Sequence, residues 1–353
     1  MSGARSGAHR VTATDVARRA GTSQSAVSRV FTPGASVSPD LREKVMEAAR
    51  SLGYRPNALA RSLITRRSRI VAVAMANLGN QFYPLVLEAL SARLQAEGYQ
   101  ILLFTADPDT PSDPVIEQVM RYQVDAVVLA STGLSSALAR ECRSLGVPVV
   151  MFNRTTDDPD LSCVTGDNER GGRSVAAFLA AGGHRRPAFI AGLEGSSTNR
   201  DRERGFALGL AEAGLAAPAR ALGHYTYEGA AEATRMLLRK IRPDAIFCAN
   251  DHMAIACIEV ARHEFGLSVP NDLSVIGFDD VGPARWRSYD LTSFSQPLGP
   301  MVDATIGMLL EFMDDPTLPV RRVVVDGELV VRGSARCPER AAAGKNCPEP
   351  PSP

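Results

Sequence analysis

The chain has 353 residues, with 39 basic and 39 acidic side chains, so its formal net charge at pH 7 is zero. Hydrophobic residues make up 45% of it, yet none of its apolar runs is long enough to span a bilayer, which excludes a membrane-spanning protein. No secretory signal pattern opens the chain, so we expect a cytoplasmic globular protein of two or three domains, with no membrane partner.

The cysteines favour a reducing compartment. None of them forms a CxxC pair, and several lie in apolar runs, so we expect buried thiols rather than a disulfide framework or a metal site. The six are Cys142, Cys163, Cys248, Cys257, Cys337 and Cys347.

The charges are unevenly distributed. The segment up to Arg69 has 13 basic and four acidic residues, and the remainder has 26 and 35, which gives net charges of +9 and −9. A basic head on an acidic body indicates a head that meets phosphate. The alternative, a solvated basic arm, does not explain why these basic residues lie on well-patterned helices.

The first elements are two short helices joined by a tight turn, in VTATDVARRAGTSQSAVSRVF, residues 11–31. Thr12 can cap the first helix, and Asp15 can reach back toward that cap. Gly21 supplies the backbone freedom for the turn, and Ser23 can cap the second helix. This is the spacing of a helix-turn-helix.

The second helix has a distinct outer face. Ala26, Val27 and Val30 would face inward. Small or hydrogen-bonding side chains that can contact base edges would point out, and these are Gln24, Ser25, Ser28 and Arg29. The pattern predicts a DNA-binding head.

A third helix, beginning at Pro39 and ending before Gly53, completes the head. The next segment, Tyr54–Arg69, can form only one or two helical turns between Ala58 and Leu63. Such a helix is marginal by itself, so we interpret it as a hinge that is ordered only on binding.

From Ile70 onward, short apolar runs alternate with helical stretches such as Phe82–Glu97 and Pro114–Tyr122. This rhythm predicts parallel strands with crossover helices. The runs DAVVLA and DAIFCA suggest that two halves share one architecture. The expected fold is an all-α helix-turn-helix head plus an α/β periplasmic-binding-protein-like body of two doubly wound parallel-sheet lobes, with a ligand cleft between them.

The expected boundaries follow from these changes of pattern. We predict an arm over 1–10, the head over 11–55, the hinge and linker over 56–69, the body over 70–336 and a disordered tail over 337–353. Within the body, the first lobe would comprise about 70–166 and 296–320, with the stretch after Thr292 returning to it through the helix Met301–Phe312. The second lobe would comprise about 167–291.

These residues resemble the lactose/purine repressor (LacI/GalR) family of transcription regulators. The resemblance runs from Val11 to about Arg332 and is strongest at four motifs, which are VTATDVARRAGTSQSAVSRVF, VSPDLREKVMEAARSLGYRPNALARSL, VTGDNERGG and SVIGFDD. It implies a sequence-specific DNA-binding regulator, and we expect a repressor.

For the head, the resemblance implies that the second helix lies in the major groove, with Gln24 and Ser25 as the main base readers. Leu63 matches a hinge leucine that wedges into the minor groove, although it could instead pack against the body. For Ser28, a phosphate contact competes with base reading. The expected DNA contacts are Thr12, Ser23, Gln24, Ser25, Ala26, Ser28, Arg29, Asn57, Ala60, Arg61, Leu63 and Ile64.

Paired hinge helices imply a homodimer on a near-palindromic operator, in double-stranded DNA. The helix Phe82–Glu97 is one expected contributor to the dimer face. An effector that changes the angle between the lobes would then change operator affinity, either as an inducer or as a corepressor.

The resemblance also implies an effector site in the cleft for a small molecule, with a sugar or sugar derivative as the expected class. Asp279 could instead hold a turn, Tyr225 could belong to the core, and we expect Asn168 to bond backbone. The expected effector residues are Asn80, Phe82, Tyr83, Asp167, Arg202, Tyr225, Asn250 and Asp279. We expect Arg202→Ala to abolish the ligand response and leave operator binding intact.

Some positions depart from the family pattern. Asn153-Arg154 stands where many relatives have an acidic residue before Arg, and His224 and His252 also replace more usual residues. If these side chains reach the cleft, the pocket is less acidic than in relatives. An isolated histidine is more often structural.

Other classes fit less well. The sequence has no GxGxxG after a strand, no GxxxxGK[ST], no GxSxG and no HExxH, so we expect no enzyme, no cofactor and no metal. A solute-binding protein with the same two-lobed fold is the alternative, but such proteins are normally exported and lack a basic head.

Overall fold

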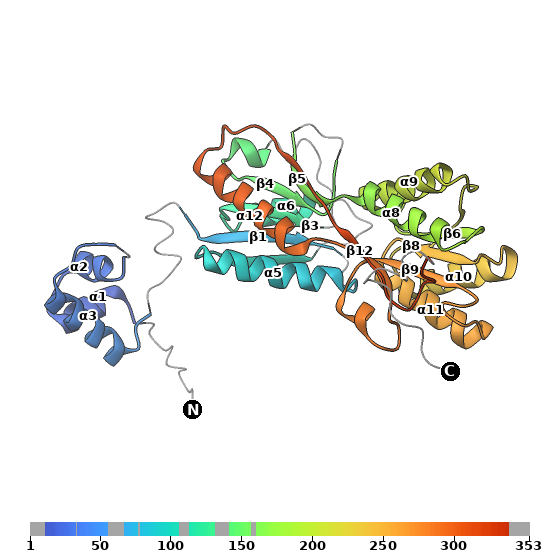
Figure 1. The fold of residues 1–353 in the computed structure, drawn as a ribbon. Coiled ribbons are helices and arrows are strands. Elements are labelled where there is room, and N and C mark those ends of the chain that lie inside the picture. The colour runs from blue at the N-terminus through green and yellow to red at the C-terminus, as the bar shows by residue number, and fades with distance from the viewer. Residues whose placement is uncertain are drawn as a thin grey trace, which may run out of the picture. The chain divides into compact units, whose positions relative to one another are not determined.

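The computed structural model describes residues 11–32, 34–55, 67–76, 78–105, 113–130, 141–156 and 160–338. The chain divides into two compact units, residues 1–68 and 69–353 (Figure 1). The expected arm, 1–10, lies outside the described residues, and so does the expected tail except for residues 337 and 338. The expected hinge contacts Asn57, Ala60, Arg61, Leu63 and Ile64 lie outside them as well.

The described residues of the first unit form the helices α1 (Ala13–Ala20), α2 (Gln24–Val30) and α3 (Pro39–Leu52). Thr12 and Asp15 form the predicted capping box at the start of α1. Gly21 ends α1 with φ of 62°, and the Ser23 hydroxyl accepts the Ala26 N–H at 3.2 Å to begin α2. The predicted helix-turn-helix is therefore present.

A small apolar core holds the three helices together. Val16, Val27 and Val45, one from each helix, are fully buried. The rings of Phe31 and Tyr54 lie 5.8 Å apart beside this core. The core gives α2 a fixed inner face, so its other side chains must point outward.

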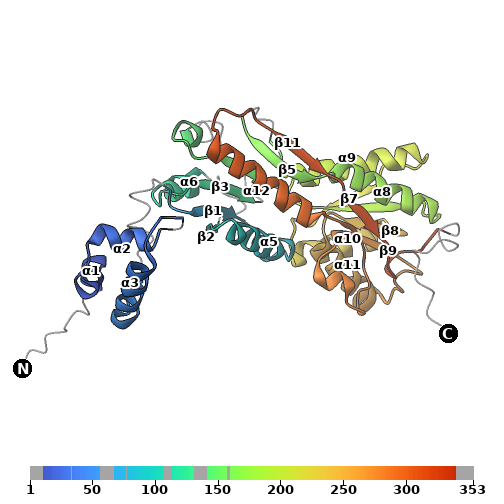
Figure 2. The same ribbon diagram turned by 60° about the vertical axis from the view of Figure 1, so that its left-hand side comes forward.

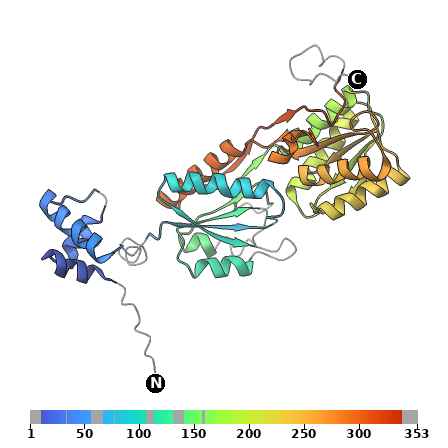
Figure 3. The ribbon, with the colours of Figure 1, turned by 90° about the horizontal axis from the view of Figure 1, so that it is seen from below.

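The first lobe of the body is a six-stranded parallel sheet in the order β11-β5-β4-β3-β1-β2. Figure 3 shows α5 (Phe82–Ala96) and α12 (Leu298–Asp314) on one face and α6 (Asp113–Met120) on the other. The strands are β1 (Ile70–Met75), β2 (Gln100–Thr105), β3 (Ala126–Ala130), β4 (Val149–Phe152), β5 (Ser162–Gly166) and β11 (Arg322–Val325).

The second lobe repeats the design with the order β12-β10-β9-β8-β6-β7, where only β12 is antiparallel. Helices α8 (Asn168–Ala181) and α9 (Ser197–Glu212) pack together, as do α10 (Tyr227–Lys240) and α11 (Asp251–Phe265). The strands are β6 (Pro187–Ala191), β7 (Ala219–Leu222), β8 (Ala245–Cys248), β9 (Ser274–Asp279), β10 (Thr292–Ser295) and β12 (Glu328–Val330), and a 3₁₀ turn, η1, spans Gly282–Arg285. The predicted pair of doubly wound lobes is confirmed.

The chain crosses between the lobes three times, after β5, after β10 and after β11. Strand β10 pairs with β9, so residues 292–295 stay in the second lobe instead of returning to the first as expected. Strand β11 lies beside β5, which extends the first lobe beyond residue 320 (Figure 2). The two lobes are therefore joined by three crossing segments.

Close packing of α8 on α9 depends on glycines. A Cβ added to Gly205 would lie 2.0 Å from the Glu169 carbonyl oxygen, and one added to Gly172 would lie 2.3 Å from the Arg202 carbonyl oxygen. The two helix backbones therefore touch where the cleft begins. This contact brings Arg202 on α9 beside Asn168 at the start of α8.

Four of the predicted thiols, Cys142, Cys163, Cys248 and Cys257, are buried and free. Cys337 is disulfide-bonded, so the expectation of a thiol was wrong for this residue. Among the described helices, none combines the length and apolar character that a membrane crossing requires.

Candidate functional site

The head presents a polar row along α2. Gln24, Ser25, Ser28 and Arg29 are exposed, whereas Ala26 is half-buried against the core. Thr12 and Ser23 use their hydroxyls as helix caps, at 3.3 Å from the Asp15 N–H and 3.2 Å from the Ala26 N–H. Exposed donors and acceptors on one helix, with no apolar group among them, can contact the edges of base pairs.

In the body, a pocket lies where the carboxyl ends of both sheets face each other. It has about 270 Å³ of empty space, including its opening. Five of the eight predicted effector residues line it, and Asn153, Arg154 and Thr198 complete the wall. The lining residues are Asn80, Tyr83, Asn153, Arg154, Thr198, Arg202, Tyr225 and Asp279.

Arg202 is the best-connected side chain at this pocket. It is 2% exposed, and each of its three nitrogens donates to a protein oxygen. Nε donates to Asn168 Oδ1 at 2.8 Å, Nη1 to the Ala249 carbonyl at 2.5 Å, and Nη2 to Asp279 Oδ1 at 3.3 Å. Its guanidinium also lies 3.7 Å from the centre of the Phe278 ring. Arg202 is therefore held rigidly before any ligand arrives.

Asp279 connects this arginine to a crossing segment. Its Oδ1 also accepts the Gln296 amide N–H at 2.8 Å, and Gln296 follows β10 at the second crossing. Burial raises the pKa of Asp279, and the Arg202 charge opposes that shift. A change at Asp279 can therefore reach the connection between the lobes.

Asp251, which the sequence analysis did not identify, stabilises the segment next to Asp279. It is fully buried and accepts the Val281 N–H at 2.9 Å and the Ser293 hydroxyl at 2.6 Å. Burial raises its pKa well above the usual range, and the nearby Asp279 charge adds to that rise. It fixes the turn after β9, where Asp279 has φ of 109°. The only sequence signal was its place at the start of a helix directly after a buried strand.

Three predicted effector residues are not in the pocket wall. Phe82 is 2% exposed and belongs to the first-lobe core, where apolar packing places it. Asp167 caps α8 by accepting the Arg170 N–H at 3.0 Å, and Asn250 caps α11 by accepting the Met253 N–H at 3.0 Å. The latter two act on helix termini near the cleft.

Other expectations concern single polar residues. Asn168 donates to the Gly166 carbonyl at 3.0 Å, as expected for a backbone contact, and it also holds Arg202. His252 packs near Tyr227, with ring centroids 6.3 Å apart, and His224 is exposed. Neither histidine lines the pocket, whereas Asn153 and Arg154, which depart from the family pattern, do.

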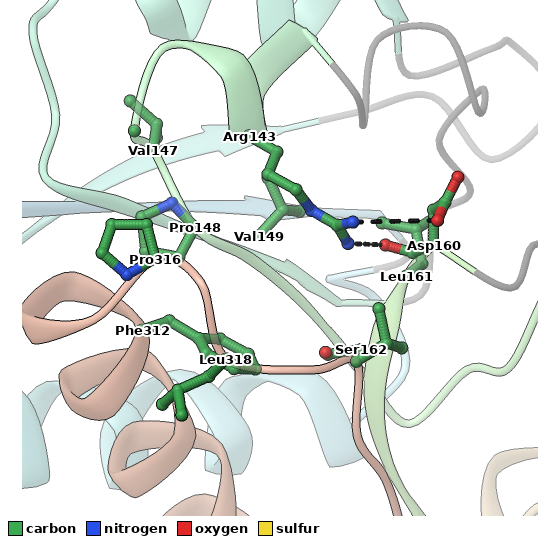
Figure 4. A pocket seen from close by; sticks show the side chains of 12 residues that line it. Arg143, Val147, Pro148, Val149, Asp160, Leu161, Ser162, Phe312, Pro316 and Leu318 are labelled. Carbon is green, nitrogen blue, oxygen red and sulfur yellow. Dashed lines mark hydrogen bonds and ion pairs between the residues drawn. The ribbon is translucent and has the colours of Figure 1, made fainter.

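A second pocket, with about 470 Å³ of empty space, lies at the other end of the first lobe (Figure 4). Its wall is mainly apolar, with Val147, Leu161 and Phe312, and Arg143 pairs with Asp160 at one side. It adjoins the amino ends of β4 and β5. Ligands of open α/β sheets bind at the carboxyl ends, so the pocket between the lobes is the candidate ligand site.

Comparison with known proteins gives matches along most of the chain. A model described as "Bacterial regulatory proteins, lacI family" matches residues 12–57, and one described as "Periplasmic binding protein-like domain" matches residues 176–335. Catabolite control protein A of Priestia megaterium is 31% identical over 333 residues, covering 92% of this chain and 99% of that protein.

The ribose operon repressor of Escherichia coli K12 is 32% identical over 327 residues, covering 91% of this chain and 98% of that protein. A structure of the lac repressor dimer bound to operator and the anti-inducer ONPF superimposes with a TM-score of 0.83 at 26% identity. That match covers 92% of this chain and 99% of the repressor chain.

Proposed function

The chain belongs to the lacI family of bacterial regulatory proteins, and from this premise we propose how it works. It is a sequence-specific DNA-binding repressor, located in the cytoplasm, whose operator affinity is set by a small sugar-like effector held between two lobes. One observation carries this function. The same chain joins a helix-turn-helix with an exposed polar row to a two-lobed body whose pocket is lined by polar side chains.

On the DNA side, α2 enters the major groove and Gln24 and Ser25 read base edges, because they are exposed on its first turn. Arg29 reaches a guanine or a phosphate. Leu63 of the hinge enters the minor groove, as the family resemblance implies.

The working unit is a homodimer on a near-palindromic operator, as for the lac repressor dimer bound to its operator. Helix α5 contributes to the dimer face, as the family resemblance implies.

Effector and operator are thermodynamically linked. Asp279 contacts the pocket and also accepts a hydrogen bond from Gln296 in a crossing segment, so a ligand that contacts Asp279 changes how the lobes are joined. The first lobe continues into the hinge through β1, and the coupling is reciprocal. Measuring operator affinity with ligand present distinguishes an inducer from a corepressor.

A solute-binding protein of the same fold would not need the head, and the two relatives reported above are named as a catabolite control protein and a ribose operon repressor. The test begins by selecting duplexes from random-sequence DNA with the full chain. Gln24→Ala should weaken binding to the selected duplex about 10- to 100-fold, since a bidentate base contact contributes about 1–3 kcal/mol. Binding to random duplex should stay unchanged in a gel-shift assay.

Gln118→Ala is the matched control, because Gln118 is an exposed glutamine on α6 of the body, on the face of the sheet opposite to α5 (Figure 3). It should leave binding to both duplexes intact. Leu63→Ala should likewise weaken specific binding far more than random binding, and equal losses on both duplexes would contradict base reading and the wedge. If no duplex is enriched, the proposed function is wrong.

A further inference from the structure

We propose that the effector carries an acidic group, a carboxylate or a phosphate, which binds at Arg154 beside the start of α9. This inference rests on the proposed function for the use of the pocket. It adds the charge of the ligand, which family membership leaves open.

The first argument is the charge of the pocket wall. Among the described residues of the wall, the only arginine, lysine, aspartate or glutamate residues are Arg202, Asp279 and Arg154. Arg202 and Asp279 neutralise each other, with 3.3 Å between Nη2 and Oδ1. Arg154 forms no ion pair with any residue that the structure describes, and its buried Nε has no hydrogen-bond partner. One positive charge is therefore left over for a ligand.

The second argument is the position of α9. The Thr155 N–H donates to Ser197 Oγ at 2.9 Å, which brings the chain next to Arg154 against the first turn of this 16-residue helix. That first turn contains no acidic residue, and Ser197 and Thr198 are 7% and 5% exposed. A helix N-terminus with buried N–H groups favours an anion.

The third argument is an unsatisfied group in the wall. Asn153 is 3% exposed, its φ is 58°, and its Oδ1 has no hydrogen-bond partner. Buried polar atoms are normally hydrogen-bonded, so this one indicates a ligand donor such as a hydroxyl. Across the pocket the Thr198 and Tyr225 hydroxyls lie 3.2 Å apart and add further hydrogen-bonding groups. The wall therefore suits a hydroxylated ligand with one acidic group.

A neutral sugar fits this wall less well. Carboxylates are the strong acceptors for sugar hydroxyls, and Asp279 is the only carboxylate among the described residues of the wall. Its Oδ1 already accepts from Arg202 and Gln296, so one oxygen, Oδ2, remains for a sugar hydroxyl.

The test measures binding of neutral and acidic partners to the full chain by calorimetry at constant ionic strength. The probes are glucose, gluconate, glucuronate and glucose 6-phosphate, together with galactose and galacturonate. At least one acid should bind ten times or more tightly than its neutral parent. The carboxylate and phosphate members show which acidic group is preferred.

Arg154→Gln should reduce the affinity for the preferred acid at least tenfold and leave the weak binding of its neutral parent unchanged. Arg200→Gln is the matched control, because it removes an equal charge from an exposed position on the first turn of α9 and should change affinity less than twofold. Thermal unfolding of both variants verifies that they fold.

The inference is overturned if no acid in the panel binds, if a neutral sugar binds as tightly as its acid, or if Arg154→Gln keeps the preference. Operator binding is measured in parallel by gel shift. A neutral sugar that shifts operator affinity would leave the proposed function standing without the acidic group. An acid that binds at Arg154 without any effect on operator affinity would support the anion site and contradict the proposed effector role.

Discussion

The two lobes have the same strand order and yet differ in what they bury at the cleft. The second lobe buries a connected polar network in which Arg202 bonds Asn168 and Asp279, with Asp251 behind them. Among the described residues, the first lobe contributes Asn80, Tyr83, Asn153 and Arg154 to the pocket, all from segments at the ends of strands or helices.

The difference also concerns which groups are satisfied. All three nitrogens of Arg202 have protein partners, whereas Asn153 Oδ1 and Arg154 Nε in the first lobe have none. A ligand therefore meets a rigid second lobe and supplies partners that the first lobe lacks. A ligand that contacts both lobes binds across the cleft, so its binding should depend on the separation of the lobes. A regulator needs this property.

The strongest way to break this comparison is Arg202→Met. Removing the cation leaves the Asp279 carboxylate buried without its charge partner, which should cost about 3–5 kcal/mol of unfolding free energy. Denaturant unfolding of the full chain measures the loss. The expectation that Arg202→Ala abolishes the ligand response and leaves operator binding intact stays a prediction, and it has to be tested under conditions in which the variant is folded.

A double variant sharpens that experiment. Arg202→Met combined with Asp279→Asn removes the buried charge and keeps a side chain that tolerates the φ of 109° at this position, so it should recover most of the lost stability without restoring the ligand response. If the double variant is less stable than Arg202→Met alone, the buried charge of Asp279 is not the cause of the loss.

Helix packing gives a second contrast between the lobes. Gly205→Ala on α9 places a Cβ 2.0 Å from the Glu169 carbonyl, so the backbones must separate, at a cost of about 1–3 kcal/mol. Gly307 on α12 of the first lobe has no atom within 4 Å of an added Cβ. Gly307→Ala should therefore raise the free energy of unfolding by about 0.5–1 kcal/mol, because alanine is the better helix former.

Thermal unfolding of the two glycine variants provides the measurement, and each serves as the control of the other. Opposite signs of the change in melting temperature are expected. A neutral result for Gly205→Ala would contradict the close contact of α8 with α9 that aligns Arg202 with Asn168.

The smallest effect concerns acid sensitivity of the second lobe. His184 is 1% exposed, and burial lowers its pKa below the usual 6.5, with the Arg336 charge adding to the shift. A depressed histidine pKa gives stability that is present above pH 6.5 and is lost as the pH falls, because only the unfolded chain takes up the proton. By pH 6 the free energy of unfolding has fallen by at most about 0.8 kcal/mol from this cause.

His184→Gln should therefore flatten the fall of melting temperature between pH 7 and pH 5. His252 shifts in the same direction through burial, so His252→Gln should add to the effect. An unchanged slope in the double variant would mean that neither histidine is kept neutral by burial.

Much of the fold was predictable because its signals are local. Thr12, Gly21 and Ser23 act within a few residues of themselves, as helix caps and a turn. Apolar runs of buried strands, such as β3, need no partner to be recognised. The late crossings were harder, since only pairing with β9 and β5 shows that β10 belongs to the second lobe and β11 to the first.

The effector residues were only partly predictable for a related reason. A polar residue at the end of a strand can face a ligand or cap the next helix, and both uses favour the same side chains. Asp167 and Asn250 became caps, while Asp279 faced the pocket and Phe82 entered the core. No sequence pattern indicated that Thr198 lines the pocket, because its neighbours there come from distant segments.

The amino-acid sequence alone determined the basic helical head, the repeated α/β design and the family, since these depend on caps, periodicity and charge along neighbouring residues. Only the tertiary structure decided that Arg202 pairs with Asp279, whereas Arg154 at the pocket wall has no ion-pair partner among the described residues. Neutralisation depends on which groups approach within a few ångströms, and that is set by how three chain crossings bring two sheets together.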